Sequence, residues 1–198
     1  RAHEWRGARQ CSYFYIYIEI NLYTCKMNTI VRPVARIARH RKSIAIDIDE
    51  VLCPFLSPMA KWKGLKLPKT KYPYVYKDIF NISASESTTM VNEFYESAAF
   101  RSIEPMQGAQ RALSHMYNAG YKIYIVTGRQ SRVRDDTERW LGWNFPYQIH
   151  DLIMTNSYTH NEVPKEDICK SIGANLIIDD NYDTCVHCDA CHIQAINY

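Results

Sequence analysis

The sequence predicts an α/β protein in which a parallel β-sheet is flanked by helices. From residue 43 onward, short β-branched apolar runs alternate with longer segments in which apolar residues recur every three or four positions. Such runs are typical of strands and such segments of helices, and their alternation indicates right-handed crossovers between parallel strands. Several apolar runs also end in aspartate or threonine, so polar side chains should gather at one edge of the sheet.

The first strand is the run SIAIDID over residues 43–49. Side chains alternate between the two faces of a strand, so Asp47 and Asp49 are predicted to point to the same side at its carboxyl end. Carboxylates suit Mg²⁺, which also keeps several waters and takes a substrate phosphate. The pair therefore indicates a cation and nucleophile site, although two solvated acids after a buried strand would give the same short pattern.

The later elements of the core domain, residues 43–198, follow in regular alternation. A helix over residues 105–119 begins at Pro105 and stops at Gly120. The others are a strand over residues 122–126, a helix over 131–141, a strand over 152–155, a helix over 165–172, a strand over 176–178, and a further helix followed by a strand over 192–196.

Residues 52–104 are too many for a simple crossover, which needs little more than about a dozen residues. We predict that they form a helical cap inserted after the first core strand. Aromatic side chains are frequent in this segment and could build a cap core or stack on a nucleobase, with core packing favoured for any one of them. They are Phe55, Trp62, Tyr72, Tyr74, Tyr76, Phe80, Phe94, Tyr95 and Phe100.

Four short motifs are expected at one edge of the sheet, because the carboxyl ends of parallel strands lie together. Each has a plain interpretation when taken alone: solvated acids, a turn, or an exposed lysine. Their joint occurrence in this order indicates a single site. The residues are Asp47 and Asp49 after the first strand, Thr127 at the end of the second, Lys165 at a helix start, and Asp179 and Asp180 after the fourth strand.

In these motifs the sequence resembles the haloacid dehalogenase-like (HAD) phosphohydrolase superfamily over about residues 43–198. The matching strings are DIDEV at 47–51, VTGR at 126–129, Lys165, and IIDDN at 177–181. The resemblance implies a Rossmann-like core, Mg²⁺ as cofactor and a small phosphorylated substrate. Within the superfamily the chain is similar to the 5′(3′)-deoxyribonucleotidase group, from which Glu50 departs because a small residue is usual there.

The resemblance also implies the reaction: hydrolysis of phosphomonoesters, (deoxy)nucleoside monophosphates in particular, through an aspartyl-phosphate. Asp47 would be the nucleophile, and Asp49 the acid that protonates the leaving oxygen and then activates water. The implied catalytic residues are Asp47, Asp49, Thr127 and Lys165; the implied substrate-binding residues are Thr127, Gly128, Arg129 and Lys165; the implied metal ligands are Asp47, Asp49 through its main-chain carbonyl, Asp179 and Asp180.

Charge is distributed unevenly along the chain. Residues 1–43 carry nine Lys and Arg against two acids, a net +7, whereas residues 44–198 carry fifteen against nineteen, a net −4. The globular part therefore offers no basic face for nucleic acid. Two alternatives stay open: a phosphatase acting on nucleic-acid ends, with the basic arm holding the polymer, and a non-catalytic phosphate-binding module. The oligomeric state is not indicated.

Residues 1–42 are predicted to be a flexible basic leader. The apolar stretch over residues 12–23 is too short and too polar to span a bilayer, which takes roughly 20 apolar residues. Met27 is a candidate start of the protein, and residues 27–42 could instead be an organellar targeting segment because they are rich in arginine and poor in acids. Seven irregularly spaced cysteines favour reduced thiols. We therefore expect a cytoplasmic protein, or an organellar one if that segment acts in targeting.

The string CVHCDACH near the carboxyl terminus contains Cys185, Cys188 and Cys191 together with His187 and His192. Its CxxCH portion formally matches a c-type haem attachment site, and the same residues could supply zinc ligands. The string falls where the fold needs a helix after the fourth strand, so we favour free thiols.

Overall fold

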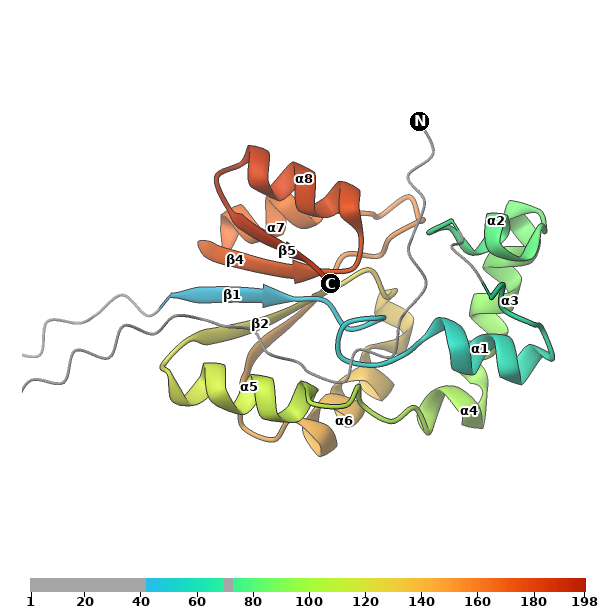
Figure 1. Cartoon of the computed structure of the whole chain (residues 1–198), viewed down its shortest axis with the longest axis horizontal. Coiled ribbons are helices and arrows are strands. Elements are labelled where there is room, and N and C mark those ends of the chain that lie inside the picture. Colours follow the sequence, from blue (N-terminus) through green and yellow to red (C-terminus); the bar gives the residue numbers. More distant parts are fainter. Residues whose placement is uncertain (1–41, 70–72) are drawn as a thin grey trace, which may run out of the picture.

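The computed structural model describes residues 42–69 and 73–198. In this part of the chain one five-stranded sheet has the order β3-β2-β1-β4-β5, and every neighbouring pair is parallel (Figure 1). The strands are β1 (Ser43–Ile46), β2 (Lys122–Thr127), β3 (Ile149–Met154), β4 (Ala174–Asp179) and β5 (Gln194–Asn197). The predicted α/β class with a Rossmann-like parallel sheet is therefore confirmed.

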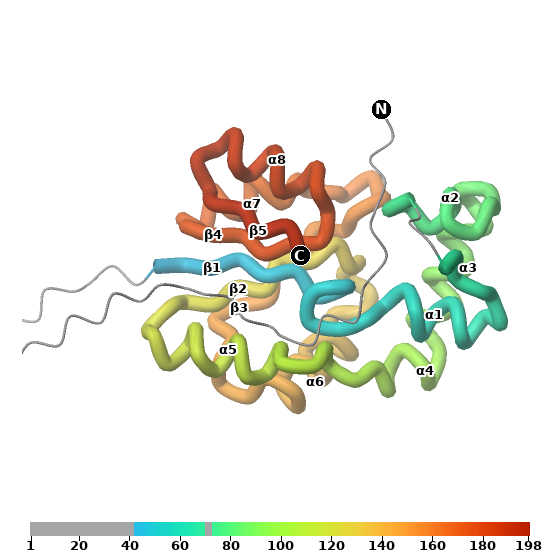
Figure 2. Tube along the Cα trace, in the orientation of Figure 1, coloured from blue at the N-terminus to red at the C-terminus, as the bar shows by residue number. Residues whose placement is uncertain are grey.

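Helices cover both faces of the sheet. On one face lie α5 (Ala109–Asn118) and α6 (Arg134–Asn144), and on the other lie α7 (Lys165–Ser171) and α8 (Tyr182–Ala190) (Figures 1 and 2). The chain builds outward from β1 to β3 and then crosses to β4 on the other side of β1. At such a reversal, open α/β sheets bind ligands beyond the carboxyl ends of their strands.

The central strand β1 packs against both helical layers because its side chains alternate between the two faces. Ile44 and Ile46 belong to the larger hydrophobic cluster, together with Leu113 of α5. Ala45 belongs to a smaller cluster with Cys169 of α7. Burial on both faces explains why this strand has apolar residues at successive positions.

Between β1 and α5, the described residues form four helices beyond the carboxyl ends of the strands (Figure 1). They are α1 (Leu56–Lys63), α2 (Tyr76–Phe80), α3 (Ala84–Glu96) and α4 (Ala98–Arg101). Their aromatic core is centred on Phe55, whose ring centroid lies 5.2 Å from that of Phe94, 5.7 Å from that of Tyr95 and 6.3 Å from that of Phe100. These four rings thus pack against one another in the core of the helical segment. Tyr72 lies outside the described residues.

Some element boundaries differ from the predicted ones for identifiable reasons. Strand β1 ends at Ile46, and just beyond it the amides of residues 51–53 all donate to the Ile48 carbonyl and turn the chain. Helix α5 begins at Ala109 instead of at the proline upstream, because Gly108 has a φ of 92° and interrupts the helical path.

Residues 1–41 lie outside the described part of the chain, so the basic leader, the start at Met27 and the targeting segment stay predictions. Among the helices of residues 42–69 and 73–198, none combines the length and the apolar character needed to cross a bilayer.

Candidate active site

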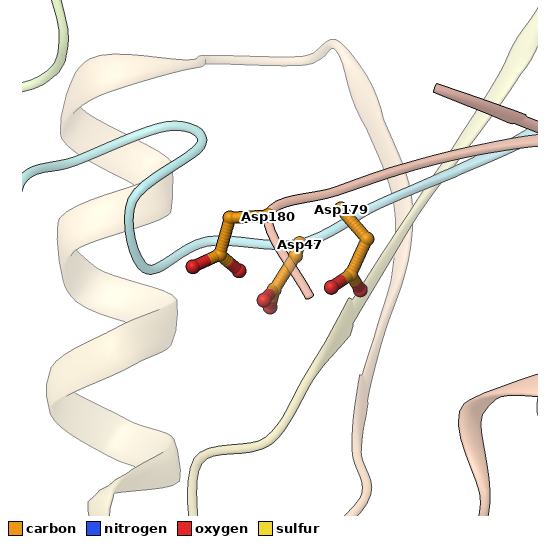
Figure 3. Close-up of side chains that lie close together, drawn as sticks. All are labelled: Asp47, Asp179 and Asp180. Carbon is orange, nitrogen blue, oxygen red and sulfur yellow. The ribbon is translucent and has the colours of Figure 1, made fainter. Parts of the chain in front are cut away.

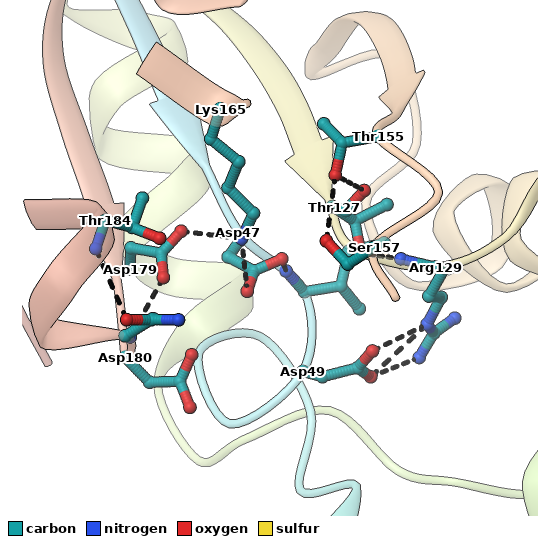
Figure 4. A network of polar contacts seen from close by, with 12 residues as sticks. Asp47, Asp49, Thr127, Arg129, Thr155, Ser157, Lys165, Asp179, Asp180 and Thr184 are labelled. Atoms are coloured by element: carbon teal, nitrogen blue, oxygen red, sulfur yellow. Dashed lines mark hydrogen bonds and ion pairs between the residues drawn. The ribbon is translucent and has the colours of Figure 1, made fainter. Parts of the chain in front are cut away.

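Three charged side chains meet at the carboxyl edge of the sheet (Figure 4). Lys165, the first residue of α7, places Nζ 2.8 Å from Asp47 Oδ2 and 2.6 Å from Asp179 Oδ2. Asp47 follows β1, and its amide donates to the Ile178 carbonyl of β4 at 3.0 Å. Strand pairing therefore fixes where the Asp47 carboxylate lies relative to β4 and to Asp179 at its end.

Asp180 adds a third carboxylate to this edge (Figure 3). One oxygen of each of Asp47, Asp179 and Asp180 lies within 4.8 Å of the others, and all three residues are buried. Asp180 Oδ1 is buried without a hydrogen-bond partner in the described part of the chain. Three hard oxygen donors, one of them unpartnered, fit a Mg²⁺ ion. The Asp49 carboxylate lies outside this group, and its predicted metal contact was the main-chain carbonyl.

Burial and mutual repulsion shift the ionisation of the cluster. Burial raises the pKa of Asp47 to about 7; Lys165 opposes this shift and Asp179 adds to it. Burial, followed by repulsion from Asp47 and Asp179, raises the pKa of Asp180 well above its ordinary value. Burial alone would lower the pKa of Lys165, but the two facing carboxylates outweigh it and the net direction is upward. Lys165 is therefore a permanent cation, and a divalent ion would offset the remaining negative charge.

Thr127 and Gly128, at the end of β2, lie against the loop that follows β3. The fully buried Thr127 accepts a hydrogen bond from the Arg129 amide at Oγ1, and its carbonyl accepts one from the Thr155 amide at 2.8 Å. Gly128 has little room for a side chain, because a Cβ there would lie 3.0 Å from Ser157 Oγ. Ser157 was not predicted from the sequence, where its only signal is a position just beyond the end of the third strand.

Asp49 has a different partner from Asp47. Arg129 donates from Nη2 to Asp49 Oδ1 at 2.6 Å and from Nε to Oδ2 at 3.0 Å (Figure 4). Burial alone would lower the pKa of Arg129, but the Asp49 carboxylate outweighs it and the net direction is upward. The sequence predicted both aspartates on one side of a strand. Strand β1 ends before them and the chain turns after Ile48, yet both residues line the same cavity, and their carboxylates pair with different cations.

Glu50, the departure from the HAD pattern, caps a helix. Its φ of 60° lies in the left-handed region, which costs energy for a residue with a side chain. Its Oε1 accepts hydrogen bonds from the amides of Phe55 at 2.8 Å and Leu56 at 2.7 Å, where α1 begins. An acid at a helix start satisfies amides that have no partner within the helix. Glu50 thus combines an unfavourable backbone conformation with a stabilising side-chain contact.

A cavity of about 970 Å³ opens over these groups. Asp47, Lys165 and Asp180 line it, as do residues of α2 and α3 and of the loop after β3. Tyr74 and Tyr158 are aromatic residues of the lining. A cavity of this size is typical of small-molecule sites and leaves room for much more than a phosphate group.

The cysteine-rich string forms part of α8 and the turn after it. Cys185 and Cys188 are buried free thiols, Cys191 is half-buried, and Cys185 Sγ contacts the Asp179 carbonyl oxygen at 3.6 Å. Within residues 42–69 and 73–198, the cluster of three aspartates is the one group of ligand atoms gathered closely enough to hold a metal ion. The zinc and haem alternatives therefore have no assembled ligand set in this part of the chain.

No protein-family model and no curated protein matches this sequence. Solved structures do resemble the fold. A haloacid dehalogenase-like family hydrolase from Streptococcus pneumoniae superposes with a TM-score of 0.57 at 14% identity, covering 78% of this chain and 83% of that one. A predicted phosphatase from Clostridium acetobutylicum gives 0.55 at 11% identity, covering 78% of this chain and 83% of that one. A HAD family hydrolase from Deinococcus radiodurans, with bound phosphate and sodium, gives 0.52 at 14% identity, covering 78% and 79%. The chain therefore has the fold of HAD hydrolases.

Proposed function

We propose that the protein is a Mg²⁺-dependent phosphatase of the HAD superfamily, which hydrolyses small phosphomonoesters through an aspartyl-phosphate on Asp47. The observation that carries the proposal is the position of Lys165 between Asp47 and Asp179, beside a buried acid cluster that fits a divalent cation. A phosphate monoester dianion repels a carboxylate nucleophile, so positive charge has to offset this repulsion before the nucleophile reaches phosphorus. Fold likeness to hydrolases and to a predicted phosphatase supports the same reaction class.

Each residue of the edge has a distinct part in this reaction. Asp47 attacks phosphorus in line with the leaving oxygen, while Thr127 and Lys165 hold the phosphoryl oxygens. Asp49 gives a proton to the leaving oxygen and later takes one from the water that hydrolyses the intermediate. When bound by Asp47, Asp179 and the main chain of Asp49, with Asp180 nearby, Mg²⁺ supplies electrostatic stabilisation of the phosphoryl charge.

(Deoxy)nucleoside monophosphates are the substrates that we favour. Tyr74 and Tyr158 line a cavity of about 970 Å³, and aromatic rings stack on nucleobases with little regard to which base is present. The similarity to the 5′(3′)-deoxyribonucleotidase group supports the same substrate class. In this role the helices α1 to α4 act as the cap, which binds the part of the substrate remote from phosphorus and thereby contributes binding energy to catalysis.

The test is phosphate release from a panel of nucleoside monophosphates, sugar phosphates, aryl phosphates and end-phosphorylated oligonucleotides, with Mg²⁺ or with EDTA. We expect Mg²⁺-dependent release, with the highest kcat/KM on nucleotides. Asp47→Asn should be inactive, and Asp189→Asn, on an exposed position of α8, is the matched control that should behave as wild type.

Three results would contradict parts of the proposal. More than a tenth of wild-type activity in Asp47→Asn would exclude the covalent mechanism. Faster release from oligonucleotide ends than from mononucleotides would favour the nucleic-acid-end alternative. Phosphate binding without hydrolysis of any ester would favour a non-catalytic binding module.

A further inference from the structure

We propose that Arg129 is a positioning residue for the proton transfers, since its guanidinium holds the Asp49 carboxylate in the orientation from which Asp49 serves the leaving oxygen. This inference rests on the proposed function, because only phosphoryl transfer gives Asp49 protons to move. It differs from the sequence prediction, in which the resemblance assigned Arg129 to substrate binding.

The contact between the two side chains is a fork. Arg129 Nη2 lies 2.6 Å from Asp49 Oδ1, and Nε lies 3.0 Å from Oδ2. Two parallel hydrogen bonds fix the plane of a carboxylate as well as its position, which a single ammonium contact does not do. Cys53 Sγ adds a contact of 3.6 Å to Oδ1. Rotation of the Asp49 side chain would break all of these contacts together.

Arg129 is itself held from several directions. Its Nη1 donates to the buried Thr137 Oγ1 of α6 at 3.2 Å, and its Cζ lies 4.9 Å from the centre of the Phe100 ring of α4. Its main-chain amide donates to Thr127 Oγ1 at 3.3 Å. A long side chain orients its partner only when its own conformation is fixed, and the 2% exposure of the Arg129 side chain meets that condition.

The same contacts argue against direct binding of the substrate phosphoryl group by Arg129. All three guanidinium nitrogens of Arg129 donate to protein groups: Nε and Nη2 to Asp49, and Nη1 to Thr137. A two-point contact with a phosphoryl group would require the guanidinium to give up a bond to Asp49, in a largely buried ion pair whose disruption is strongly unfavourable. The cation beside Asp47 is Lys165, at 2.8 Å.

In the reaction, an Asp47 oxygen forms a bond to phosphorus while the bond from phosphorus to the leaving oxygen breaks. The leaving oxygen keeps the electron pair and takes a proton from Asp49, which enters this step as the carboxylic acid and leaves it as the carboxylate that Arg129 holds. In the second step, water attacks phosphorus, the bond to Asp47 breaks, and Asp49 takes the proton of the water. Both transfers require Asp49 to face the leaving oxygen, so loss of the fork should slow both.

A double-mutant cycle tests the inference, with Arg129→Ala, Asp49→Asn and the combined variant. Misplacing a reacting group by about 1 Å costs up to roughly 100-fold, so Arg129→Ala should lower kcat by roughly 10- to 100-fold with little change in KM. In the Asp49→Asn background the same substitution should cost less than about twofold, because nothing is left to orient. The loss should also be smaller on an aryl phosphate than on an alkyl phosphate, because an acidic leaving group needs less protonation.

Two milder variants test the same inference in case Arg129→Ala does not fold. Arg129→Lys keeps the charge but not the fork, and should fall between wild type and Arg129→Ala. Thr137→Val removes one anchor of the guanidinium without touching the ion pair, and should give a smaller loss with the same dependence on the leaving group.

Additive losses in the cycle, an equal loss on both leaving groups, or a KM increase of tenfold or more with kcat unchanged would overturn the positioning role. The last of these would return Arg129 to substrate binding. A wild-type protein that hydrolyses none of the esters would instead refute the proposed function, and the positioning role with it.

Discussion

Replacing Asp47 by asparagine is expected to stabilise the metal-free protein while it abolishes turnover. Asp47 is buried beside Asp179 and Asp180, and burial raises its pKa from 3.8 to about 7 although Lys165 lies 2.8 Å away. Ionised Asp47 therefore lowers the stability of the fold, which is a known cost of catalytic groups. Removing the charge should relieve that cost.

The size of the effect follows from the shift. A tenfold change in an equilibrium constant corresponds to about 1.36 kcal/mol, so a pKa of about 7 against the ordinary 3.8 makes the ionised form costly by about 4 kcal/mol. Asp47 accepts hydrogen bonds from the Ile48 amide and from Lys165 with different oxygens. Asparagine has one carbonyl oxygen, and losing one of these contacts costs about 2 kcal/mol. The net gain of about 2 kcal/mol corresponds to a Tm increase of roughly 4–8 °C for a domain of this size.

The stability gain of Asp47→Asn over wild type should increase with pH. Because the pKa of Asp47 is higher in the folded state, the folded protein binds this proton more tightly, and wild-type stability falls as pH rises from about 4 to about 7. The advantage of Asp47→Asn should be absent below pH 4 and complete above pH 7.

Thermal unfolding in EDTA at pH 4 and pH 8 measures the effect. Asp49→Asn is the matched control, because it leaves Arg129 buried without its carboxylate partner and should lower Tm. A Tm of Asp47→Asn at or below that of wild type at pH 8 would refute the electrostatic reasoning.

Three other substitutions have expected outcomes. Lys165→Met should lower kcat by roughly 100- to 1,000-fold, as for loss of a preorganised charge-stabilising group. Lys170→Met, on the exposed side of α7, is the control and should leave kcat unchanged. Equal kcat values for the two variants in steady-state kinetics would contradict the reasoning. Gly128→Ala should lower kcat by roughly tenfold, because the new Cβ would lie 3.0 Å from Ser157 Oγ. Adding Ser157→Gly to this variant should restore most of the lost kcat. If kcat stays low in the double variant, the steric explanation is excluded. In urea, the free energy of unfolding of Glu50→Ala should be about 1 kcal/mol lower than that of Glu50→Gly, because both lose the helix cap and only alanine is strained at a φ of 60°. Equal free energies of unfolding would contradict the strain argument.

Features that follow from backbone topology were predictable from the sequence. Alternating strands and helices specify a parallel sheet, and the carboxyl ends of its strands lie at one edge. The prediction that Asp47, Lys165 and Asp179 meet there needed only their positions at the ends of elements, and Lys165 does lie within 2.8 Å of both carboxylates.

Features that depend on single torsions were not predictable. Strand β1 ends before the aspartate pair and the chain turns after Ile48, so the alternation of side chains along a strand could not indicate which cation Asp49 pairs with. Its partner Arg129 is 80 residues away and reaches it through a particular side-chain conformation. The capping of α1 by Glu50 likewise depends on a left-handed backbone conformation that no pattern in the sequence signals.

The most direct test of the account is to trap the phosphoryl group on Asp47. Asp49→Asn with a labelled aryl phosphate, quenched in acid within milliseconds, should accumulate an acid-stable, base-labile phosphoenzyme, because an acidic leaving group departs without the acid while hydrolysis still needs the base. Peptide mapping by mass spectrometry should locate the label on Asp47, and Asp47→Asn should carry none. Turnover without any label on Asp47, or label on another residue, would contradict the covalent mechanism.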